Sequence, residues 1–381
     1  MTGNLSCKPA QIATLLVLSL TTAVFAQESK SLAQQVGVYH WGGKHASGYS
    51  SGIRDLTSLN ARIVRLTISP QLHRDYNQGP ACLPNFTLSG ALDNPDLLSA
   101  LAHPQLEVIM ITTYDGAGFG DCFTHPYLNP EWYTPGNTER IVSEYSEFVH
   151  RLHVLLQGTG KRLILSNWEG DNALYCGQAY SYLHSDVFRE QCLAAYPLAY
   201  GGNRGPQDSV KGMVLWLKAR YLGMTSGRER AKLSGLTGVQ VESAIEFCSL
   251  SMLRSHGLQS VLYDVLPSVA FDYISYSAYE SLTAADPASA LRADLNRIQM
   301  LTGTKRIILG EVGFSRSRLG DRQIEAIHKV TNAAIEWGVP YIILWNLYDQ
   351  DVENDYGLFD LEGRISTLGI EYSRMLSLES K

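Results

Sequence analysis

Apolar, β-branched segments alternate with segments of helical periodicity along most of the chain, and this alternation restricts the fold more than any other feature. Strands that are joined through helices pair in parallel with right-handed crossovers. Eight strand–helix units close naturally into a barrel, so we predict an α/β fold of the (β/α)8 TIM-barrel class. The expected strands cover residues 36–39, 61–68, 106–112, 162–166, 238–247, 271–276, 306–311 and 340–345.

An open, doubly wound sheet is the competing fold. It would carry a glycine-rich phosphate-binding loop after the first strand. The Gly42-Gly43 pair found there lacks the G-x-G-x-x-G spacing, so a nucleotide site is disfavoured. A helix is expected over 207–233, and the segment before it, which holds the tyrosines from Tyr175 to Tyr200, is expected to be a long loop. Two interpretations of these tyrosines remain open: they line a substrate subsite, or they pack the loop.

The first 26 residues have the pattern of a cleavable secretory signal peptide. Lys8 precedes a short apolar run from Ile12 to Leu20, and small residues precede the expected cleavage point after Ala26. The remaining 381 − 26 = 355 residues, 27–381, are expected to form a single barrel domain of a secreted or periplasmic protein. No later apolar stretch is long enough for a transmembrane helix.

The cysteines are consistent with export, because an oxidising compartment permits disulfides. Cys176 and Cys192 would close one loop, and Cys82 with Cys122 would join two neighbouring loops. Cys248 is the expected free thiol, and a chain without any disulfide is the alternative.

Composition excludes several classes of function. The formal net charge of −6 disfavours nucleic acid and anionic membranes as partners, because no basic stripe is present to contact phosphates. The sequence has no H-x-H, H-E-x-x-H or C-x-x-C motif, so neither a metal nor another cofactor is expected. Ser50 lies in a G-x-S-x-G pattern, but it lacks the preceding strand that a nucleophile elbow needs.

Among the residues at the predicted strand ends, two stand out as a carboxylate pair, Glu169 after the fourth strand and Glu311 at the end of the seventh. In a parallel barrel the strand tips face one site. Paired carboxylates at such a site are the machinery of glycoside hydrolysis, in which one acid protonates the leaving oxygen and the other attacks the anomeric carbon or activates water. Arg65 would keep one carboxylate ionised, and desolvation beside Trp168 would keep the other protonated.

The chain resembles the clan A glycoside hydrolases, the (β/α)8 superfamily of retaining glycosidases with catalytic residues on strands four and seven. The resemblance rests on three motifs in order, Trp168-Glu169-Gly170-Asp171, Gly310-Glu311-Val312-Gly313 and Leu344-Trp345-Asn346. It implies a carbohydrate substrate, with Glu169 as general acid/base and Glu311 as nucleophile. It also implies that Arg65 and Tyr276 hydrogen-bond the nucleophile and that Trp345 forms the floor under the sugar.

One position departs from the clan pattern. Its members usually have Asn directly before the acid/base, where the amide binds the sugar 2-hydroxyl, whereas Trp168 stands there in this chain and Asn167 lies one residue earlier. Two other classes remain open, a carbohydrate-binding barrel without turnover and a barrel with transglycosylase or lyase chemistry.

Further strand-end residues are candidates for substrate contacts. For two of them the alternative is structural: core packing for His40 and a salt bridge for Glu246. Because strand side chains alternate, Tyr273 is expected to point outward if Tyr276 points inward. The complete set of expected substrate-binding residues is Arg65, Asn167, Trp168, Tyr276, Trp345, His40, Glu246 and Tyr114.

Overall fold

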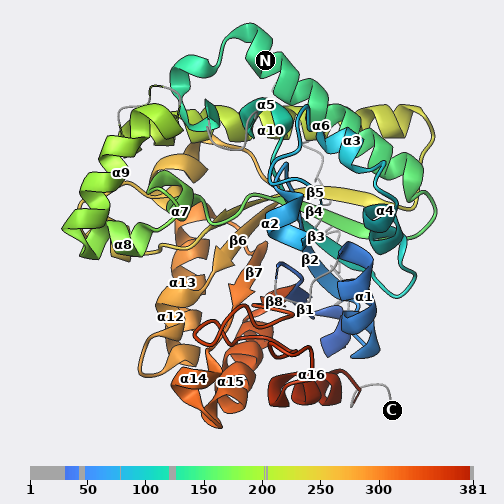
Figure 1. The fold of residues 1–381 in the computed structure, drawn as a ribbon, viewed down its shortest axis with the longest axis vertical. Coiled ribbons are helices and arrows are strands. Elements are labelled where there is room, and N and C mark those ends of the chain that lie inside the picture. The colour runs from blue at the N-terminus through green and yellow to red at the C-terminus, as the bar shows by residue number, and fades with distance from the viewer. Residues whose placement is uncertain are drawn as a thin grey trace, which may run out of the picture. The chain divides into compact units, whose positions relative to one another are not determined.

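Eight parallel strands form a closed barrel in which each strand pairs with its neighbours in chain order and β8 closes on β1. The computed structural model describes residues 31–42, 48–77, 79–119, 126–200, 202 and 205–377. The predicted (β/α)8 class is therefore confirmed (Figure 1). The strands are β1 (Val36–Tyr39), β2 (Ile63–Ile68), β3 (Val108–Thr113), β4 (Arg162–Ser166), β5 (Gln240–Phe247), β6 (Tyr273–Ser277), β7 (Ile307–Val312) and β8 (Ile342–Leu344).

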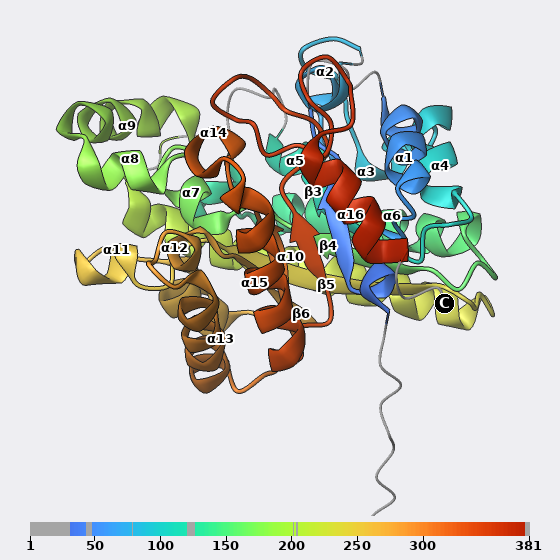
Figure 2. The same ribbon diagram turned by 90° about the horizontal axis from the view of Figure 1, so that it is seen from below.

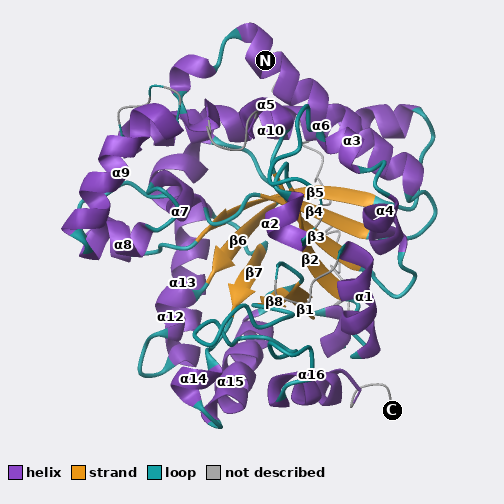
Figure 3. Cartoon of the chain, viewed as in Figure 1, coloured by secondary structure: helices purple, strands orange, loops and turns teal. Residues whose placement is uncertain are grey.

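Helices surround the strands on all sides of the barrel (Figure 3). Several begin at a residue with the appropriate capping chemistry: Asn94 accepts from the first turn of α4, and Asp286 accepts from that of α13. The helices around the strands are α1 (Tyr49–Ser58), α2 (Leu72–Tyr76), α3 (Leu88–Ala91), α4 (Pro95–Ala102), α5 (Gly116–Phe119), α6 (Pro135–Leu155), α10 (Pro206–Leu233), α11 (Met252–Ser255), α12 (Tyr279–Leu282), α13 (Pro287–Thr302), α14 (Arg316–Leu319), α15 (Arg322–Trp337) and α16 (Thr367–Ser377). Shorter turns are η1 (Leu32–Gln34), η2 (Pro126–Leu128), η3 (Pro130–Trp132), the π-helix η4 (Val261–Val265) and η5 (Leu266–Ser268).

The segment between β4 and α10 is helical, which corrects the expectation of a long loop. It contains α7 (Gly170–Leu174), α8 (Ala179–His184) and α9 (Asp186–Ala199), and Figures 1 and 2 show α8 and α9 outside the ring of barrel helices. The predicted disulfide between Cys176 and Cys192 joins the turn after α7 to α9. The expected loop tyrosines pack this insertion: Tyr196 is buried and donates its hydroxyl to the carbonyl of Leu174.

Strand side chains divide between two cores. One apolar layer lies between the strands and the surrounding helices, and a second cluster comes from alternate strand positions that face the barrel interior. The interior cluster consists of Tyr39, Ile63, Val108, Met110, Ile164, Ala244, Tyr273, Ile308, Tyr341 and Ile343.

Strand β7 contains an irregularity that changes where its side chains point. Tyr276 of β6 pairs with Leu309 of β7, but the next residue, Ser277, pairs with Glu311, so Gly310 is an extra residue on β7. The pairing of β7 with β8 shifts over the same residues. A bulge of this kind re-aims the following side chain. Strict alternation from the inward-facing Ile308 would turn Glu311 outward, whereas the extra residue lets it face the interior.

Cys248 is a free thiol, as expected. Cys82 is bonded in a disulfide, and its expected partner Cys122 lies outside the described residues, as does the expected signal peptide 1–26. Within the described ranges, no helix combines the length and the apolarity that crossing a bilayer requires.

Candidate active site

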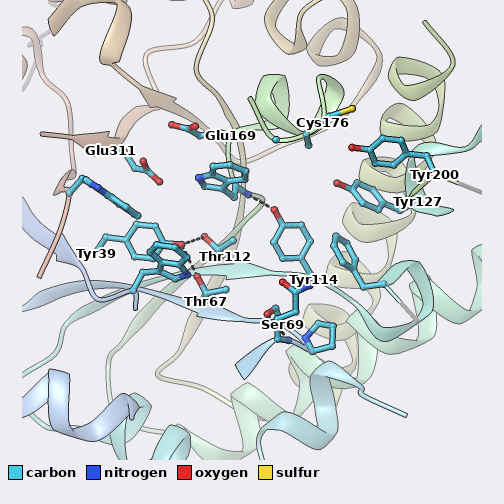
Figure 4. A pocket seen from close by; sticks show the side chains of 18 of the residues that line it. Tyr39, Thr67, Ser69, Thr112, Tyr114, Tyr127, Glu169, Cys176, Tyr200 and Glu311 are labelled. Carbon is cyan, nitrogen blue, oxygen red and sulfur yellow. Dashed lines mark hydrogen bonds between the residues drawn. The ribbon is translucent and has the colours of Figure 1, made fainter. Parts of the chain in front are cut away.

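A cavity of 570 Å³ opens at the C-terminal ends of the strands, which is where barrel enzymes carry their sites. Glu169 and Glu311 both line it, and Figure 4 shows them together at one end, with Tyr127 and Tyr200 at the other. Nine of its nineteen lining residues are aromatic. They are Tyr39, Trp41, Thr67, Ser69, Pro70, Gln71, Thr112, Tyr114, Phe119, Tyr127, Trp168, Glu169, Ala173, Cys176, Gly177, Tyr200, Tyr279, Glu311 and Trp345.

The two predicted catalytic carboxylates are close neighbours. One oxygen each of Glu169, Glu246 and Glu311 lies within 4.8 Å of the others. Carboxyl groups about 5–5.5 Å apart are typical of retaining glycosidases, whereas inverting enzymes separate them by about 6.5–9.5 Å to admit a water. The spacing in this barrel therefore matches the retaining geometry.

A buried arginine, Arg65, contacts two of these three carboxylates. Nη1 of Arg65 lies 2.8 Å from Oε2 of Glu246 and 3.4 Å from Oε1 of Glu311. It also donates to the carbonyl of Gly310 at 3.0 Å, and Thr112 accepts from Nε and Nη2 at 3.0 and 2.8 Å. The guanidinium is fully buried, so its charge acts on these carboxylates with little screening by water.

The carboxylate of Glu246 accepts hydrogen bonds from three buried side chains. It accepts from Arg65, from Ser275 at 3.2 Å and from Ser277 at 2.9 Å. Gly310 of β7 lies against it, and a Cβ built there would come within 2.1 Å of Ser275 Oγ and 2.9 Å of Glu246 Oε2. The absence of a side chain at position 310 thus lets both the bulge and the carboxylate fit.

Glu311 receives two stabilising contacts. Besides Arg65, the hydroxyl of Tyr279 donates to Oε2 at 3.3 Å. Burial raises the pKa of Glu311, and the nearby Glu169 raises it further, whereas the charge of Arg65 lowers it. Because the guanidinium contacts Glu311 directly, we assign the negative charge of the pair to this residue.

Glu169 occupies a different environment. It precedes α7, and its Oε2 accepts a hydrogen bond from the side-chain amide of Asn172. Burial, followed by the charge of Glu246, raises the pKa of Glu169 to about 8. A carboxyl group with that pKa holds its proton at neutral pH, so the site pairs one acid with one carboxylate.

Aromatic rings form the walls around the pair. Trp345, after β8, packs edge-on against Tyr39 at 5.1 Å and lies 5.5 Å from Trp41, measured between ring centroids. Across the cavity, the hydroxyl of Tyr114 accepts from the main-chain N–H of Trp168 at 3.3 Å (Figure 4). Such surfaces suit a sugar ring, whose C–H faces stack on aromatic side chains.

The structure separates the eight expected substrate-binding residues into three groups. Trp168, Trp345 and Tyr114 line the cavity together with the two catalytic candidates. Arg65 and Glu246 are fully buried and do not line it, so they are placed as supports of the carboxylates. For Glu246 this corresponds to the salt-bridge alternative.

Three of the expected contacts are placed elsewhere. Asn167 uses its amide on the main chain of Glu246, with a donated bond of 2.9 Å and an accepted one of 3.0 Å. His40 is buried against Tyr76, bonds the carbonyl of Gly48 at 2.9 Å, and has a pKa lowered to about 4 by burial. Neither side chain lines the cavity.

Tyr276 also points away from the site, which corrects its expected contact with Glu311. Its hydroxyl donates to Asp294 of α13 at 2.9 Å, and its ring stacks on Phe247 in the outer core. Tyr273 lies in the interior cluster. Side chains on β6 therefore alternate as expected, but Tyr273 points inward and Tyr276 outward, the reverse of the prediction. Tyr279, just after β6, supplies the hydroxyl that contacts Glu311.

Sequence reasoning missed several lining residues. Tyr39 of β1 and Thr67 of β2 face the barrel interior, and their hydroxyls are hydrogen-bonded to each other at 2.6 Å. A correct assignment of which residues on each strand point inward would have identified both. Tyr127 comes from the connection after β3, and no local pattern marks it. Tyr200 belongs to the tyrosines of the segment from Tyr175 to Tyr200, for which lining a subsite was one of two interpretations, and it lines the cavity.

Three acidic side chains this close can in principle coordinate a cation. In this cluster, however, Arg65 already contacts two of the carboxylates at 2.8 and 3.4 Å. The donor set therefore fits proton sharing and an internal counter-ion better than a metal.

The buried ion pair generates a test of stability. Replacing Glu246 by Ala leaves the guanidinium of Arg65 buried without its main partner, and losing one member of a buried pair costs about 3–5 kcal/mol. We expect Glu246→Ala to lower the free energy of unfolding by that amount in urea denaturation followed by circular dichroism. The control is Glu325→Ala, which removes an exposed pair with Lys329 and should leave stability unchanged. Equal, small effects in both variants would show that the pair does not support the barrel.

No protein-family model and no curated protein sequence matches this chain. Solved structures do match it. A beta-glucosidase shares 12% identity over 86% of this chain and 87% of its own, with a TM-score of 0.54. An exo-β-1,4-mannosidase from Opitutaceae bacterium strain TAV5 shares 14% over 91% and 59%, with a TM-score of 0.50. A GH5_18 variant from Bifidobacterium longum subsp. longum, in complex with Manβ1-4GlcNAc, shares 13% over 91% and 79%, with a TM-score of 0.55. One of these neighbours is named as a GH5_18 protein and two are named as glycosidases, so the fold that the strand-end motifs indicated is the fold of known glycoside hydrolases.

Proposed function

We propose that this protein is a retaining glycoside hydrolase that cleaves O-glycosidic bonds of an oligo- or polysaccharide by double displacement. The observation that carries the proposal is the carboxylate pair at the ends of β4 and β7, with oxygens within 4.8 Å of each other in one cavity. The different environments of the two groups add to it, because a retaining mechanism needs one protonated and one ionised carboxyl.

In the first step, Glu169 donates its proton to the glycosidic oxygen while the carboxylate of Glu311 attacks the anomeric carbon. The bond to the leaving group breaks, and an ester forms between the sugar and Glu311. In the second step, Glu169, now a carboxylate, takes a proton from water, and the water displaces Glu311. Arg65 and Tyr279 hold Glu311 in place and stabilise its charge when it leaves the sugar.

The aromatic surfaces support a carbohydrate as the substrate. Trp345 lines the same cavity as Glu311, and the cavity extends from Glu169 and Glu311 at one end to Tyr127 and Tyr200 at the other (Figure 4). The length of the cavity supports a substrate of more than one sugar ring. The names of the neighbours in fold, a beta-glucosidase and an exo-β-1,4-mannosidase, support β-linked hexosides as the first substrates to test. The Cys176–Cys192 disulfide supports an oxidising compartment, in line with the proposed export.

A trapping experiment tests the mechanism. We expect aryl β-glucosides and β-mannosides to be hydrolysed with retention, and an activated 2-deoxy-2-fluoro analogue of the accepted sugar to form a covalent adduct on the peptide that contains Glu311. Glu311→Ala should lower kcat by at least roughly 10³-fold, because it removes the nucleophile. Mass spectrometry of the intact and digested protein detects the adduct, and Glu325→Ala is the control.

The other outcomes select between the alternatives. Full activity of Glu311→Ala, or an adduct on another residue, would overturn the assignment of the nucleophile. Sugar binding without any turnover by the wild type would favour a carbohydrate-binding barrel. Elongated or unsaturated products would indicate transglycosylase or lyase chemistry.

The pKa values predict a bell-shaped dependence of kcat/KM on pH. Glu169 must carry a proton, so activity should fall as the pH rises through its pKa of about 8. Glu311 must be ionised, so activity should fall as the pH drops through its pKa, which burial raises above 4.5. With an activated leaving group that needs no acid, Glu169→Gln should lose the alkaline limb. An alkaline limb that persists in this variant would have to come from another group.

The two tyrosines of the β6 region give a matched pair of variants. Tyr279→Phe removes a hydrogen bond to the ionised Glu311, which is worth about 1.5–3 kcal/mol and corresponds to a roughly 10–100-fold loss in kcat/KM. Tyr276→Phe removes a bond to Asp294 outside the cavity. It should change kcat/KM by less than about 2-fold and lower stability by about 1 kcal/mol. If steady-state kinetics showed a larger loss of kcat/KM for Tyr276→Phe than for Tyr279→Phe, Tyr276 would be the tyrosine that acts in the site.

A further inference from the structure

Asn172 lies in the single turn of α7, three residues after Glu169, and no step of the mechanism above uses it. Its side-chain Nδ2 donates to Oε2 of Glu169. Its Oδ1 accepts from the main-chain N–H of Ala179 at 2.9 Å, the first residue of α8. The amide therefore lies between the acid/base candidate and the start of the next helix.

The orientation of this amide follows from its partners. An N–H group such as that of Ala179 can only donate, so the oxygen of Asn172 must face it and the nitrogen must face Glu169. The preceding Gln178 provides no side-chain cap for α8, which makes Asn172 the acceptor for that helix end. A flipped amide would leave the Ala179 donor unsatisfied and is disfavoured for that reason.

The turn that carries Asn172 is itself anchored to the barrel. Asp171 accepts main-chain hydrogen bonds from Cys248 at 2.9 Å, Ser249 at 2.8 Å and Val261 at 2.7 Å. A Cβ at Gly170 would come within 2.8 Å of Val261 Cγ2. These contacts leave α7 little freedom, so Asn172 presents its N–H from a defined position.

The second oxygen of Glu169 has no such donor. Oε1 is buried without a hydrogen-bond partner among the described residues. Ser277 lies nearby, but a hydroxyl has one proton, and Ser277 donates it to Glu246 at 2.9 Å. In a protonated carboxyl group, the oxygen that accepts from an N–H is the carbonyl oxygen, so the proton belongs on the other oxygen.

We propose that Asn172 is a positioning residue for the acid/base, which holds Oε2 of Glu169 as an acceptor and so leaves the acidic proton on Oε1. This inference rests on the proposed function, because the proton matters only if Glu169 acts as an acid. The same bond favours the ionised form of Glu169 after proton transfer. Asn172 therefore supports both halves of the double displacement.

Other groups also act on the protonation of Glu169. The titratable or charged side chains that face it are Glu246 of β5, Arg65 of β2, Glu311 of β7, Tyr279 after β6 and Cys248 after β5. None of these is changed by a substitution at position 172, so such a variant isolates the contribution of the amide.

Two variants and one control separate this role from a purely structural one. Asn172→Ala removes the amide. Asn172→Asp keeps an oxygen for the Ala179 N–H but replaces the donor toward Glu169, so it preserves the start of α8. Gln178→Ala changes an exposed residue of the same insertion whose side chain bonds Ser181, and it should leave all parameters at wild-type values.

We expect both Asn172 variants to lower kcat/KM about 10-fold for a glycoside with a poor leaving group, which needs the acid. For the dinitrophenyl glycoside of the same sugar, whose leaving group does not need the acid, kcat/KM should change by less than about 2-fold. The alkaline limb of the pH profile should move to higher pH in Asn172→Ala and further in Asn172→Asp, because a donor to the ionised carboxyl is lost and then replaced by a like charge. Equal losses for both leaving groups, or an unmoved alkaline limb, would overturn the proposal.

A direct titration distinguishes failure of this inference from failure of the proposed function. The side-chain carboxyl carbons of glutamate can be followed by ¹³C NMR in the wild type, with Glu169→Gln identifying the signal. A higher pKa of Glu169 in both Asn172 variants supports the inference even if no glycoside is turned over. An unchanged pKa in an active enzyme overturns the inference and leaves the proposed function intact.

Discussion

The site depends on one buried cation. Arg65 lies at the centre of the barrel, where its guanidinium bonds Glu246 and the carbonyl of Gly310 and contacts Glu311. With its bonds to Thr112 of β3, Arg65 thus joins four strands, β2, β3, β5 and β7, through a single side chain. A buried charge is costly unless it is paired, and here the pairing also orients the proposed nucleophile. The same contacts therefore serve the stability of the barrel and the geometry of the site.

The glycine before Glu311 has a role that only the structure makes visible. It is the extra residue of the β7 bulge, and it leaves room for the carboxylate of Glu246. With regular pairing, the inward position on β7 would fall on residue 310, and the carboxylate at 311 would point into the outer core. A larger residue at 310 would meet both Ser275 and Glu246. The Gly310-Glu311 pair is therefore a single structural unit, which explains why the carboxylate can end a strand that is buried on both faces.

The barrel and its carboxylate pair were predictable because their signals are local. Apolar runs mark the strands, and parallel topology brings their ends to one face, so Glu169 and Glu311 could be placed without coordinates. Tyr276 shows where such reasoning stops. The strand that carries Tyr276 was predicted correctly, but which of its side chains face the barrel interior was not. Tyr273, Tyr276 and Tyr279 offer the same chemistry at intervals of three residues, so the sequence did not distinguish them. Tyr127 depends on how the connection after β3 is placed at the cavity, which no short segment encodes. The tyrosines from Tyr175 to Tyr200 were noted in the sequence, but their spacing could not tell Tyr200, which lines the cavity, from Tyr196, which packs the insertion. The insertion α7–α9 was expected to be a loop; α7 and α8 are short, with five and six residues, but α9, with 14 residues, is a full helix that the sequence analysis missed.

Charge balance within the cluster explains how two neighbouring carboxyl groups take different roles. Among the described side chains, Glu169, Glu246 and Glu311 share one direct cation, Arg65, so three full negative charges at this spacing would be strongly unfavourable. Glu246 and Glu311 contact the guanidinium, and we assign the charge of the catalytic pair to Glu311, whereas Glu169 contacts a neutral amide and retains a proton. In the proposed mechanism, Glu169 transfers that proton to the leaving group while the charge on Glu311 is consumed in the bond to the sugar. The number of negative charges in the cluster thus stays constant through the step, which removes the electrostatic penalty that ionisation of Glu169 would otherwise carry.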